Sequence, residues 1–532
     1  MSRNLRSLSA RHIDGKTLFE ALSEQASTTG SLTDDQLRSL SRERLFSGAS
    51  LLATGSFYDF LKRENRGKQA YLCTGTSCLL SGQQKHAHDV LKREFPEQAI
   101  GKAVCLGHCY CSGAYQIGER IYDAENGAVS AGGSETIPVY SHTTSPMLTD
   151  HIGDITALYE LALMNRAGII EALQASGLRG RGGAGFPFAT KLAACAQEPE
   201  GQKYIVCNGD EGDPGAFSDR YLMEQQCHRL LAGMLAAGLA AGSDSGFIYI
   251  RAEYPLAVQK MAEAIDAYNN TDIFSRIGFQ FRIIRGAGSY ICGEETALLN
   301  SIEGLRPEVR MRPPYPAQEG LYGKPTLVSN VETFACIPWI LANSGRRFAS
   351  IGTGKSTGTK LVCLDNGFVK PGIHEVDMGT SFETVIHEFG GGFRRPTKAV
   401  QVGGPLGSVV PVDRISDLSL DFESFHQAGF SLGHAGIVAI PRDFAMLDFL
   451  RHLFRYMAEE SCGKCLPCRL GTEKGYRMLA MATARQPLDR AAFNDLLQVL
   501  EAGSLCGLGA GLPLPVRNIL TYFDNELVDT IK

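Results

Sequence analysis

The chain has 532 residues, of which 44% are hydrophobic and 20% charged, and its formal net charge is −5. This length predicts about three or four domains with sizeable cores, and the charge gives no reason to expect nucleic acid or an anionic membrane as a partner. The longest mostly apolar run, 230–243, is shorter than the roughly 20 residues of a membrane span. Because no apolar stretch follows the first arginines, we expect no signal peptide, no membrane insertion and a cytoplasmic location.

Patterns of apolar residues divide the chain into five predicted regions. The first is helical and polar, the second a small α/β domain, the third a larger α/β domain, the fourth rich in strands and the last helical. In that order, the expected boundaries are 1–65, 66–135, 150–350, 355–435 and 440–532.

Some elements are predicted individually. Strands at 71–73 and 102–105 are each expected to end at a cysteine, and strands at 204–208 and 246–251 belong to the larger α/β domain. The segment 127–144 is rich in glycine, serine and threonine, which predicts a linker.

A cysteine set near the C-terminus has the spacing of an iron–sulfur site. Cys462, Cys465 and Cys468 are each separated by two residues, and Cys506 returns from downstream. Four thiolates in this arrangement predict a [4Fe-4S] cluster, because soft sulfur ligands suit iron. Structural zinc is the alternative, although zinc sites with four cysteines usually contain two closely spaced pairs.

A second cysteine set lies near the N-terminus. Cys73 and Cys78 are separated by four residues, and Cys105 and Cys109 by three. Each pair could hold one iron of a [2Fe-2S] cluster, and zinc is a stronger alternative here than at the C-terminal set. His108 lies inside the second pair and is interpreted as facing solvent or supporting the ligands.

The chain has fifteen cysteines, which indicate metal binding rather than disulfides where no signal peptide is found. Seven lie outside the two sets and are interpreted as small buried hydrophobic residues, with Cys111 also a possible competing ligand. These seven are Cys111, Cys195, Cys207, Cys227, Cys292, Cys336 and Cys363.

The glycine-rich stretch 177–187 is predicted to bind a charged or flat ligand. Glycine lets the backbone approach a ligand closely and point N–H groups at a phosphate. The stretch follows a helical segment rather than a strand, so it is not the Rossmann dinucleotide fingerprint. A mobile loop is the alternative interpretation.

Two acidic segments follow the glycine-rich stretch. In 208–213, an asparagine precedes three acids, which would repel phosphate and are predicted to accept hydrogen bonds from ribityl, ribose or amide groups. A solvated turn explains this segment equally well. In 293–296, Glu294 and Glu295 open a helix, where they either complement the helix dipole or face a dinucleotide.

These motifs resemble the NuoF-type flavoprotein family. That family includes the NADH-oxidising subunit of respiratory complex I and the diaphorase subunits of NAD-reducing hydrogenases and NAD-dependent formate dehydrogenases. The resemblance extends from about residue 150 to the end and rests on the motifs at 177–187, 207–212, 292–296, 330–333 and 460–469.

The first 150 residues resemble a different subunit, the thioredoxin-like [2Fe-2S] protein of the NuoE type, through the motifs at 57–60 and 73–78. Two usually separate subunits therefore look fused. The resemblance implies an α/β multidomain fold: a thioredoxin-like domain, a Rossmann-like FMN and NAD domain, a β-grasp (SLBB) domain and a helical [4Fe-4S] bundle, at the boundaries given above.

The resemblance also implies the ligands and their sites. FMN would be held by the glycine-rich loop, and NAD(H) would stack its nicotinamide on the flavin. Glu211, Asp213 and Glu295 would hydrogen-bond the dinucleotide, while Phe186 and Tyr315 would flank its adenine. The full set of implied cofactor-binding residues is Gly180, Arg181, Gly182, Gly183, Phe186, Lys191, Asn208, Asp210, Glu211, Asp213, Tyr290, Gly293, Glu294, Glu295, Tyr315, Ser329, Asn330 and Thr333.

Four positions depart from the family pattern. Ser329 stands where a second asparagine is usual, Asp213 where a longer glutamate is, and Ala194 where an aromatic residue often packs on adenine. Tyr315 stands where phenylalanine is common and can still stack. We therefore expect one changed flavin contact and altered dinucleotide binding.

The implied function is a diaphorase subunit that transfers hydride between NAD(H) and FMN and single electrons between FMN and the clusters, with no side chain acting as acid or base. The fusion and the ending at 505–511 look closer to NAD-dependent formate dehydrogenases or NAD-reducing hydrogenases. Partners would be a molybdenum, tungsten or nickel–iron catalytic subunit and iron–sulfur subunits. The alternatives are a respiratory complex I-like NADH:acceptor oxidoreductase and, less favoured, a non-redox assembly subunit.

Overall fold

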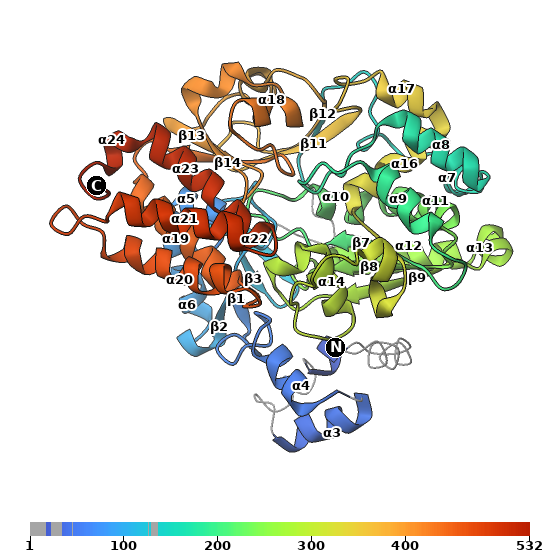
Figure 1. Cartoon of the computed structure of the whole chain (residues 1–532), viewed down its shortest axis with the longest axis horizontal. Coiled ribbons are helices and arrows are strands. Elements are labelled where there is room, and N and C mark those ends of the chain that lie inside the picture. Colours follow the sequence, from blue (N-terminus) through green and yellow to red (C-terminus); the bar gives the residue numbers. More distant parts are fainter. Residues whose placement is uncertain (1–17, 23–33, 45, 126, 129–136) are drawn as a thin grey trace.

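The computed structural model describes residues 18–22, 34–44, 46–125, 127–128 and 137–532 (Figure 1). The chain is a mixed α/β structure of several parts, built on three sheets and a C-terminal group of helices. Among these described residues, no helix has the length and apolar character needed to cross a membrane.

The N-terminal part begins with helices. α3 (Asp34–Arg44) and α4 (Gly48–Gly55) lie in the region expected to be helical, much of which falls outside the described residues. A five-stranded sheet follows, with α5 (Thr76–Ser81) and α6 (Gln84–Glu94) after its first strand. The strand order is β2 (Ile100–Ala103), β1 (Ala70–Cys73), β3 (Tyr115–Ile117), β4 (Arg120–Asp123), β5 (Gly127–Ala128).

Only one of the two strands expected to end at a cysteine does so. β1 ends at Cys73, as predicted, and runs parallel to β2. β2 ends at Ala103, so Cys105 lies in the following loop and the prediction of a strand at 102–105 is wrong at its end. Residues 105–111 form turns instead of extending beside β1, and the Cys111 N–H donates to the His108 carbonyl at 2.9 Å.

The second sheet has four parallel strands. Their order is β10 (Thr326–Asn330), β7 (Tyr204–Gly209), β8 (Ser245–Ile250), β9 (Gln280–Arg285), which confirms the strands expected at 204–208 and 246–251. Alternate residues face opposite sides, so Val206 and Phe247 pack toward α14 (Glu295–Ile302), and Ile205 and Ile248 toward α11 (Cys227–Ala241). Burial on both faces explains the continuous apolar sequences of β7 and β8.

The third sheet has six strands and both parallel and antiparallel pairs. Its order is β14 (Ser408–Pro411), β13 (Thr397–Val402), β15 (Gly436–Pro441), β11 (Thr359–Leu364), β12 (Gly372–Asp377), β6 (Val139–Ser141). β6 comes from the segment 127–144, so the linker prediction is wrong for its described ends. A serine-rich composition does not prevent a short edge strand when a neighbour such as β12 offers backbone partners.

The C-terminal part is helical, as expected from its periodicity (Figure 1). Helix α19 packs on α20, and α20 on α21. The cysteine turn at 462–465 joins the first two helices, and Cys506 directly precedes α22. The helices are α19 (Met446–Glu460), α20 (Leu466–Met481), α21 (Arg490–Gly503), α22 (Gly507–Gly511), α23 (Pro513–Tyr522) and α24 (Asp524–Leu527).

Candidate functional site

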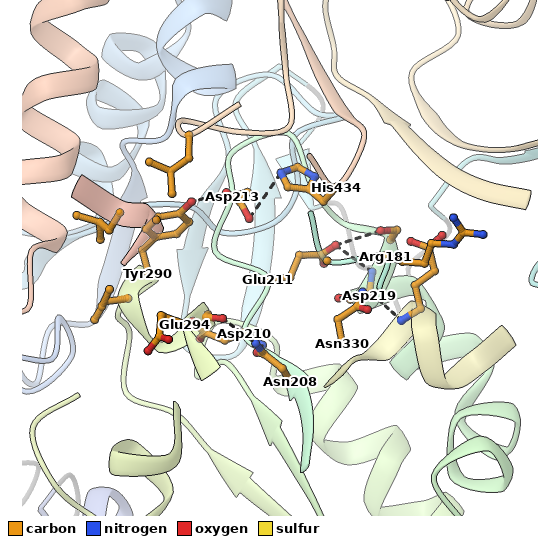
Figure 2. A pocket seen from close by; sticks show the side chains of 18 residues that line it. Arg181, Asn208, Asp210, Glu211, Asp213, Asp219, Tyr290, Glu294, Asn330 and His434 are labelled. Carbon is orange, nitrogen blue, oxygen red and sulfur yellow. Dashed lines mark hydrogen bonds and ion pairs between the residues drawn. The ribbon is translucent and has the colours of Figure 1, made fainter. Parts of the chain in front are cut away.

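A cavity of about 240 Å³ lies beyond the carboxyl ends of β7 and β10 (Figure 2). This is the edge of a parallel sheet where ligands usually bind. Ten residues predicted from the sequence line it: Arg181, Gly182, Asn208, Asp210, Glu211, Asp213, Tyr290, Gly293, Glu294 and Asn330.

Eight further residues, which the sequence did not single out, also line the cavity. They come from the starts of α10 (Ser218–Gln225) and α16 (Val331–Asn343), the turn before α14, the loops beside the third sheet and the segment after Cys506. Glu332 lies inside the motif at 330–333, and Gly507 and Leu508 lie inside the ending at 505–511, whereas no local spacing links the other five. The eight are Ser218, Asp219, Ile291, Glu332, Leu406, His434, Gly507 and Leu508.

The glycine-rich loop forms one wall of the cavity. A Cβ at Gly182 would approach the Asn330 side chain to 3.2 Å, so a larger residue would crowd this wall. The Arg181 N–H donates to Thr333 Oγ1 at 2.9 Å, and the Thr333 hydroxyl donates to Asn330 Oδ1. Thr333 is fully buried and positions the loop from behind rather than lining the cavity.

Asp210 leaves a polar atom unsatisfied at the cavity. Within the described part of the chain, Asp210 Oδ2 is buried and has no hydrogen-bond partner. The Arg181 guanidinium points away from the cavity and donates to the Thr357 carbonyl (Figure 2). Burial raises the pKa of the Asp210 carboxyl well above its usual range. Because buried polar atoms are nearly always paired, the unpaired Asp210 oxygen indicates that a polar ligand completes the site.

Asn208 joins two walls of the cavity. Its side-chain N–H donates to the Gly293 carbonyl at 2.9 Å, and its Oδ1 accepts from the Asp210 N–H at 3.0 Å. The end of β7 is thereby tied to the turn that precedes α14. This turn and the glycine-rich loop face each other across the cavity (Figure 2).

Glu211 is held by the protein itself. Its carboxylate accepts the N–H groups of Asp219 and Arg220 at 2.9 and 3.0 Å, which satisfies the first turn of α10. Burial raises the pKa of Glu211. If Glu211 also binds the dinucleotide, that contact would add to, or replace, its hydrogen bonds to the start of α10.

Asp213 lies between Tyr290 and His434. The Tyr290 hydroxyl donates to Asp213 Oδ1 at 2.7 Å, and His434 Nε2 lies 3.6 Å from Oδ2 (Figure 2). Since His434 Nδ1 accepts the Gly436 N–H at 3.0 Å, Nε2 is the nitrogen that carries hydrogen toward Asp213.

Glu294 and Glu295 behave differently from each other. Glu294 caps α14 by accepting the Thr296 and Ala297 N–H groups at 2.9 Å each. Glu295 pairs with Lys191 at 2.7 Å and with Arg312 at 2.9 Å. The interpretation that Glu294 serves the start of its helix thus accounts for its position, although its side chain also lines the cavity.

The remaining predicted residues lie outside the cavity lining. Phe186 and Tyr315 are 48% and 55% exposed, which leaves their rings free to stack on a ligand. The residues that do not line the cavity are Gly180, Gly183, Phe186, Lys191, Glu295, Tyr315, Ser329 and Thr333.

The N-terminal cysteines converge in the interior. All four are buried, and the Cys105 and Cys109 sulfurs are 3.8 Å apart. The Gly107 N–H donates to Cys105 Sγ at 3.4 Å and the Gly215 N–H to Cys109 Sγ at 3.1 Å. The contact with Cys105, followed by burial, raises the pKa of the Cys109 thiol well above its usual range. Crowded sulfurs that receive N–H groups suit thiolates bound to metal.

His108 is buried, so the interpretation that it faces solvent is wrong. The Arg220 guanidinium contacts its ring, with Nη1 2.8 Å from Nδ1. The other scattered cysteines are buried as predicted, except for Cys111, which is partly exposed.

The C-terminal cysteines gather where α19, α20 and α22 meet. Cys465 caps α20 and Cys468 lies in its first turn. A Cβ at Gly509 would lie 2.9 Å from Cys468 Cβ, which brings the loop of Cys506 against the other three. Gly507 and Leu508, the next two residues after Cys506, line the cavity.

Among the described residues, no three or more histidine, cysteine or acidic side chains are arranged around a position for one metal ion. An iron–sulfur cluster spreads its ligands over several irons and needs no such single position.

Two family models match the chain. The Nuo51 FMN-binding domain matches residues 173–339, and the NADH-ubiquinone oxidoreductase-F iron-sulfur binding region matches residues 448–530. The first match contains the glycine-rich loop and most of the cavity, and the second contains all four C-terminal cysteines.

Known proteins resemble the chain over most of their length. The NADP-reducing hydrogenase subunit HndC of Solidesulfovibrio fructosivorans is 40% identical, over 69% of this chain and 77% of that protein. An F-type subunit of the NADH-quinone oxidoreductase of Rhizobium meliloti is 39% identical, over 68% and 89%. A crystal structure of NAD+-reducing [NiFe]-hydrogenase in the H2-reduced state matches with a TM-score of 0.85 and 26% identity, over 97% of this chain and 93% of that one.

These findings define an NAD(H)-dependent oxidoreductase subunit with an FMN-binding domain and a [4Fe-4S] region. The chain belongs to the NuoF-type flavoprotein family, and the predicted diaphorase function is confirmed at this level. The unsatisfied Asp210 oxygen fits a bound flavin nucleotide, and the four cysteines beside the cavity fit a cluster that exchanges electrons with it.

Proposed function

We propose that this chain is the diaphorase subunit of an NAD-reducing hydrogenase or an NAD-dependent formate dehydrogenase. One observation carries the proposal: the cavity has the flavin loop on one side and the residues after Cys506 on the other. A ligand there lies against the [4Fe-4S] region. FMN supplies the conversion between the two-electron chemistry of nicotinamide and the one-electron chemistry of iron–sulfur clusters.

The chain's own residues bind and orient the two nucleotides. Gly180, Gly182 and Gly183 let the loop backbone approach FMN, and the unpaired oxygen of the Asp210 carboxyl is free to bond its polar groups. Asn208 and Asn330 hold the opposite walls at a fixed separation. No side chain needs to move a proton for hydride transfer, so positioning is the protein's main contribution.

Acidic residues bind the dinucleotide in this proposal. Asp213 is oriented by Tyr290, and Glu295 by Lys191 and Arg312. Glu295→Gln weakens both ion pairs, so we expect the Michaelis constant for NADH to rise more than the turnover number falls. Steady-state kinetics with a small soluble oxidant measure both, and an unchanged Michaelis constant would contradict the role of Glu295.

The N-terminal part is proposed to be a thioredoxin-like domain that binds a [2Fe-2S] cluster through Cys73, Cys78, Cys105 and Cys109. Support comes from the parallel β1–β2 pair with antiparallel β3 and β4 beside it, and from the N–H groups aimed at two sulfurs. The four parallel strands similarly support a Rossmann-like domain, and the six-stranded sheet a β-grasp domain.

The partner is proposed to be an iron–sulfur subunit that links this chain to a nickel–iron, molybdenum or tungsten centre. Leu466 and Leu470, each 59% exposed, directly follow the cysteine turn, and the partly exposed Leu505 precedes Cys506. Exposed apolar side chains at a cluster are suited to burial against another protein. A complex I-like assembly is the second candidate, because an NADH-quinone oxidoreductase protein is also similar to the chain.

Two measurements test the proposed function. The purified native complex is assayed with NAD(H) against formate, hydrogen and quinone, which separates the candidate assemblies. The isolated chain, loaded with FMN, should lose its flavin absorbance when NADH is added. A loaded chain whose flavin stays oxidised with NADH would contradict the diaphorase assignment.

A further inference from the structure

The N-terminal cysteine loop is held by an arginine from the second sheet. Arg251 directly follows β8, is 4% exposed and donates from Nη2 to the Cys105 carbonyl at 2.8 Å. Its Nη1 donates to the Glu211 carbonyl at 2.7 Å. One guanidinium therefore connects the loop that lines the nucleotide cavity with the loop that carries Cys105.

The third sheet holds the other end of the same loop. The Asn366 N–H and side-chain amide donate to the Cys109 carbonyl at 2.9 and 3.2 Å, and the amide also donates to the Cys111 carbonyl at 2.9 Å. The Gly215 N–H adds a direct bond to Cys109 Sγ. Residues 105–111 are thus fixed by groups that all lie outside the N-terminal sheet.

The charge on Arg251 lies close to the sulfurs. A guanidinium stays protonated in proteins, and its interaction with other charges is strengthened by burial. Its counter-ion, Glu253, is also buried and accepts from Nη2 at 2.6 Å. Because the guanidinium, and not Glu253, contacts the Cys105 backbone, the pair presents its positive end to the cysteine loop.

We propose that Arg251 is the residue that positions the N-terminal cysteine loop and raises the reduction potential of its iron–sulfur cluster, with Asn366 as the second anchor. The inference rests on the proposed [2Fe-2S] assignment. A cluster gains negative charge when it is reduced, so a nearby buried cation favours the reduced form.

The test is an EPR-monitored redox titration of the full-length chain, with iron and sulfide content measured alongside. Arg251→Met leaves Glu253 uncompensated, and we expect the reduction equilibrium constant to fall about tenfold, which equals a shift of about −59 mV for one electron. The double variant Arg251→Met/Glu253→Gln removes both charges and should shift the potential in the same direction by less. Arg251→Lys keeps the charge and should restore most of the wild-type potential.

A matched control is Arg276→Met. Arg276 lies in α13 (Asp272–Ile277), is exposed and pairs with Glu160 at 2.9 Å, so its loss should leave the potential unchanged. The double variant keeps the test valid if the single variant does not fold, because it buries no lone charge.

The results of these titrations distinguish a failure of the Arg251 inference from a failure of the [2Fe-2S] assignment on which it rests. Unchanged potentials in Arg251→Met or the double variant, with the cluster retained, would overturn the inference and leave the [2Fe-2S] assignment intact. Every Arg251 variant could also lose the cluster from part of the protein while the protein that keeps it has the wild-type potential. Arg251 would then have a purely structural role, and this result would overturn the inference too. A wild-type chain with zinc and no [2Fe-2S] signal would instead overturn the assignment.

Discussion

The two cysteine sets contrast in how they are built. The N-terminal four are all buried and come from β1, α5 and the loop at 105–111. They are held by Arg251, Asn366 and Gly215, which follow strands of the two other sheets. Three of the C-terminal four lie within seven residues at one helix start, and Cys465 and Cys506 are partly exposed. The first set depends on long-range packing, and the second mainly on local chain geometry.

This contrast indicates different roles on the two sides of the flavin cavity. A buried set enclosed by its own chain has no surface for a partner, so it is suited to storing an electron or tuning the flavin. A partly exposed set beside solvent-exposed leucines is suited to passing electrons to a partner protein. The cavity touches both, through Glu211 and the segment to Gly215 on one side and through Gly507 on the other.

The largest expected effect distinguishes the two sets directly. In the native complex, Cys468→Ser should abolish NADH-dependent reduction of the partner, because we propose that its set passes electrons to that partner. Cys109→Ser should preserve most of it, since its set lies off that route. The rates are measured with NADH as donor and the partner's acceptor.

A small soluble oxidant that reacts at the flavin provides the control for this pair. Both variants should keep NADH oxidation with that oxidant, provided that their flavin content is unchanged. If Cys109→Ser also stopped electron delivery to the partner, the two sets would be in series and the contrast of roles would be wrong.

The second prediction concerns the long-range support of the N-terminal set. Asn366→Ala removes the side-chain amide bonds to the Cys109 and Cys111 carbonyls, although the backbone N–H bond to Cys109 stays. It should speed loss of the proposed N-terminal cluster to a chelator by about 10–100-fold, the usual cost of losing a group that orients metal ligands. Ser461→Ala is the matched change at the C-terminal set, where Oγ lies 3.3 Å from Cys468 Sγ. Its effect should be smaller because solvent reaches that site, and equal rates would contradict the proposed difference.

The third prediction tests the exposed side of the C-terminal set. Leu466→Asp with Leu470→Asp should weaken binding of the iron–sulfur partner at least about tenfold, because interface anchors typically contribute more than about 1 kcal/mol each. Binding is measured by titrating the separated subunits. Ile155→Asp, an exposed apolar residue on α7 (Ile155–Leu161), is the control and should leave the affinity unchanged. Equal losses in both variants would exclude a specific interface at the leucines.

The sequence predicted features that depend on local spacing. The cysteine sets, the glycine-rich loop and the acids at 208–213 are each contained in a few residues, and the acids meet Gly182 at the cavity as expected. It did not predict Asp219, Leu406 or His434, because these reach the cavity through the packing of separate elements. Nor did it indicate that Glu211 and Glu294 would use their carboxylates as helix caps, since a cap and a ligand site require the same residue types.

The smallest expected effect concerns Asp210, in the acidic wall between the two sets. Burial raises its folded-state pKa, so the folded protein keeps this proton at pH values where the unfolded chain has lost it. The resulting stabilisation is complete below the unfolded-state pKa and is lost as pH rises toward the folded-state pKa. Asp210→Asn stays neutral, so in flavin-free protein its free energy of unfolding should exceed that of the wild type by about 1 kcal/mol at neutral pH, and by less near pH 4.

The same substitution should act in the opposite direction once FMN is bound, because it removes an acceptor proposed to bond the flavin. Urea unfolding of the flavin-free and FMN-loaded forms at both pH values measures the two effects, and Glu119→Gln, an exposed acid, is the control. A variant less stable than the wild type at neutral pH without flavin would mean that Asp210 is charged and well solvated. The unsatisfied carboxyl would then no longer indicate a ligand in the space between the two cysteine sets.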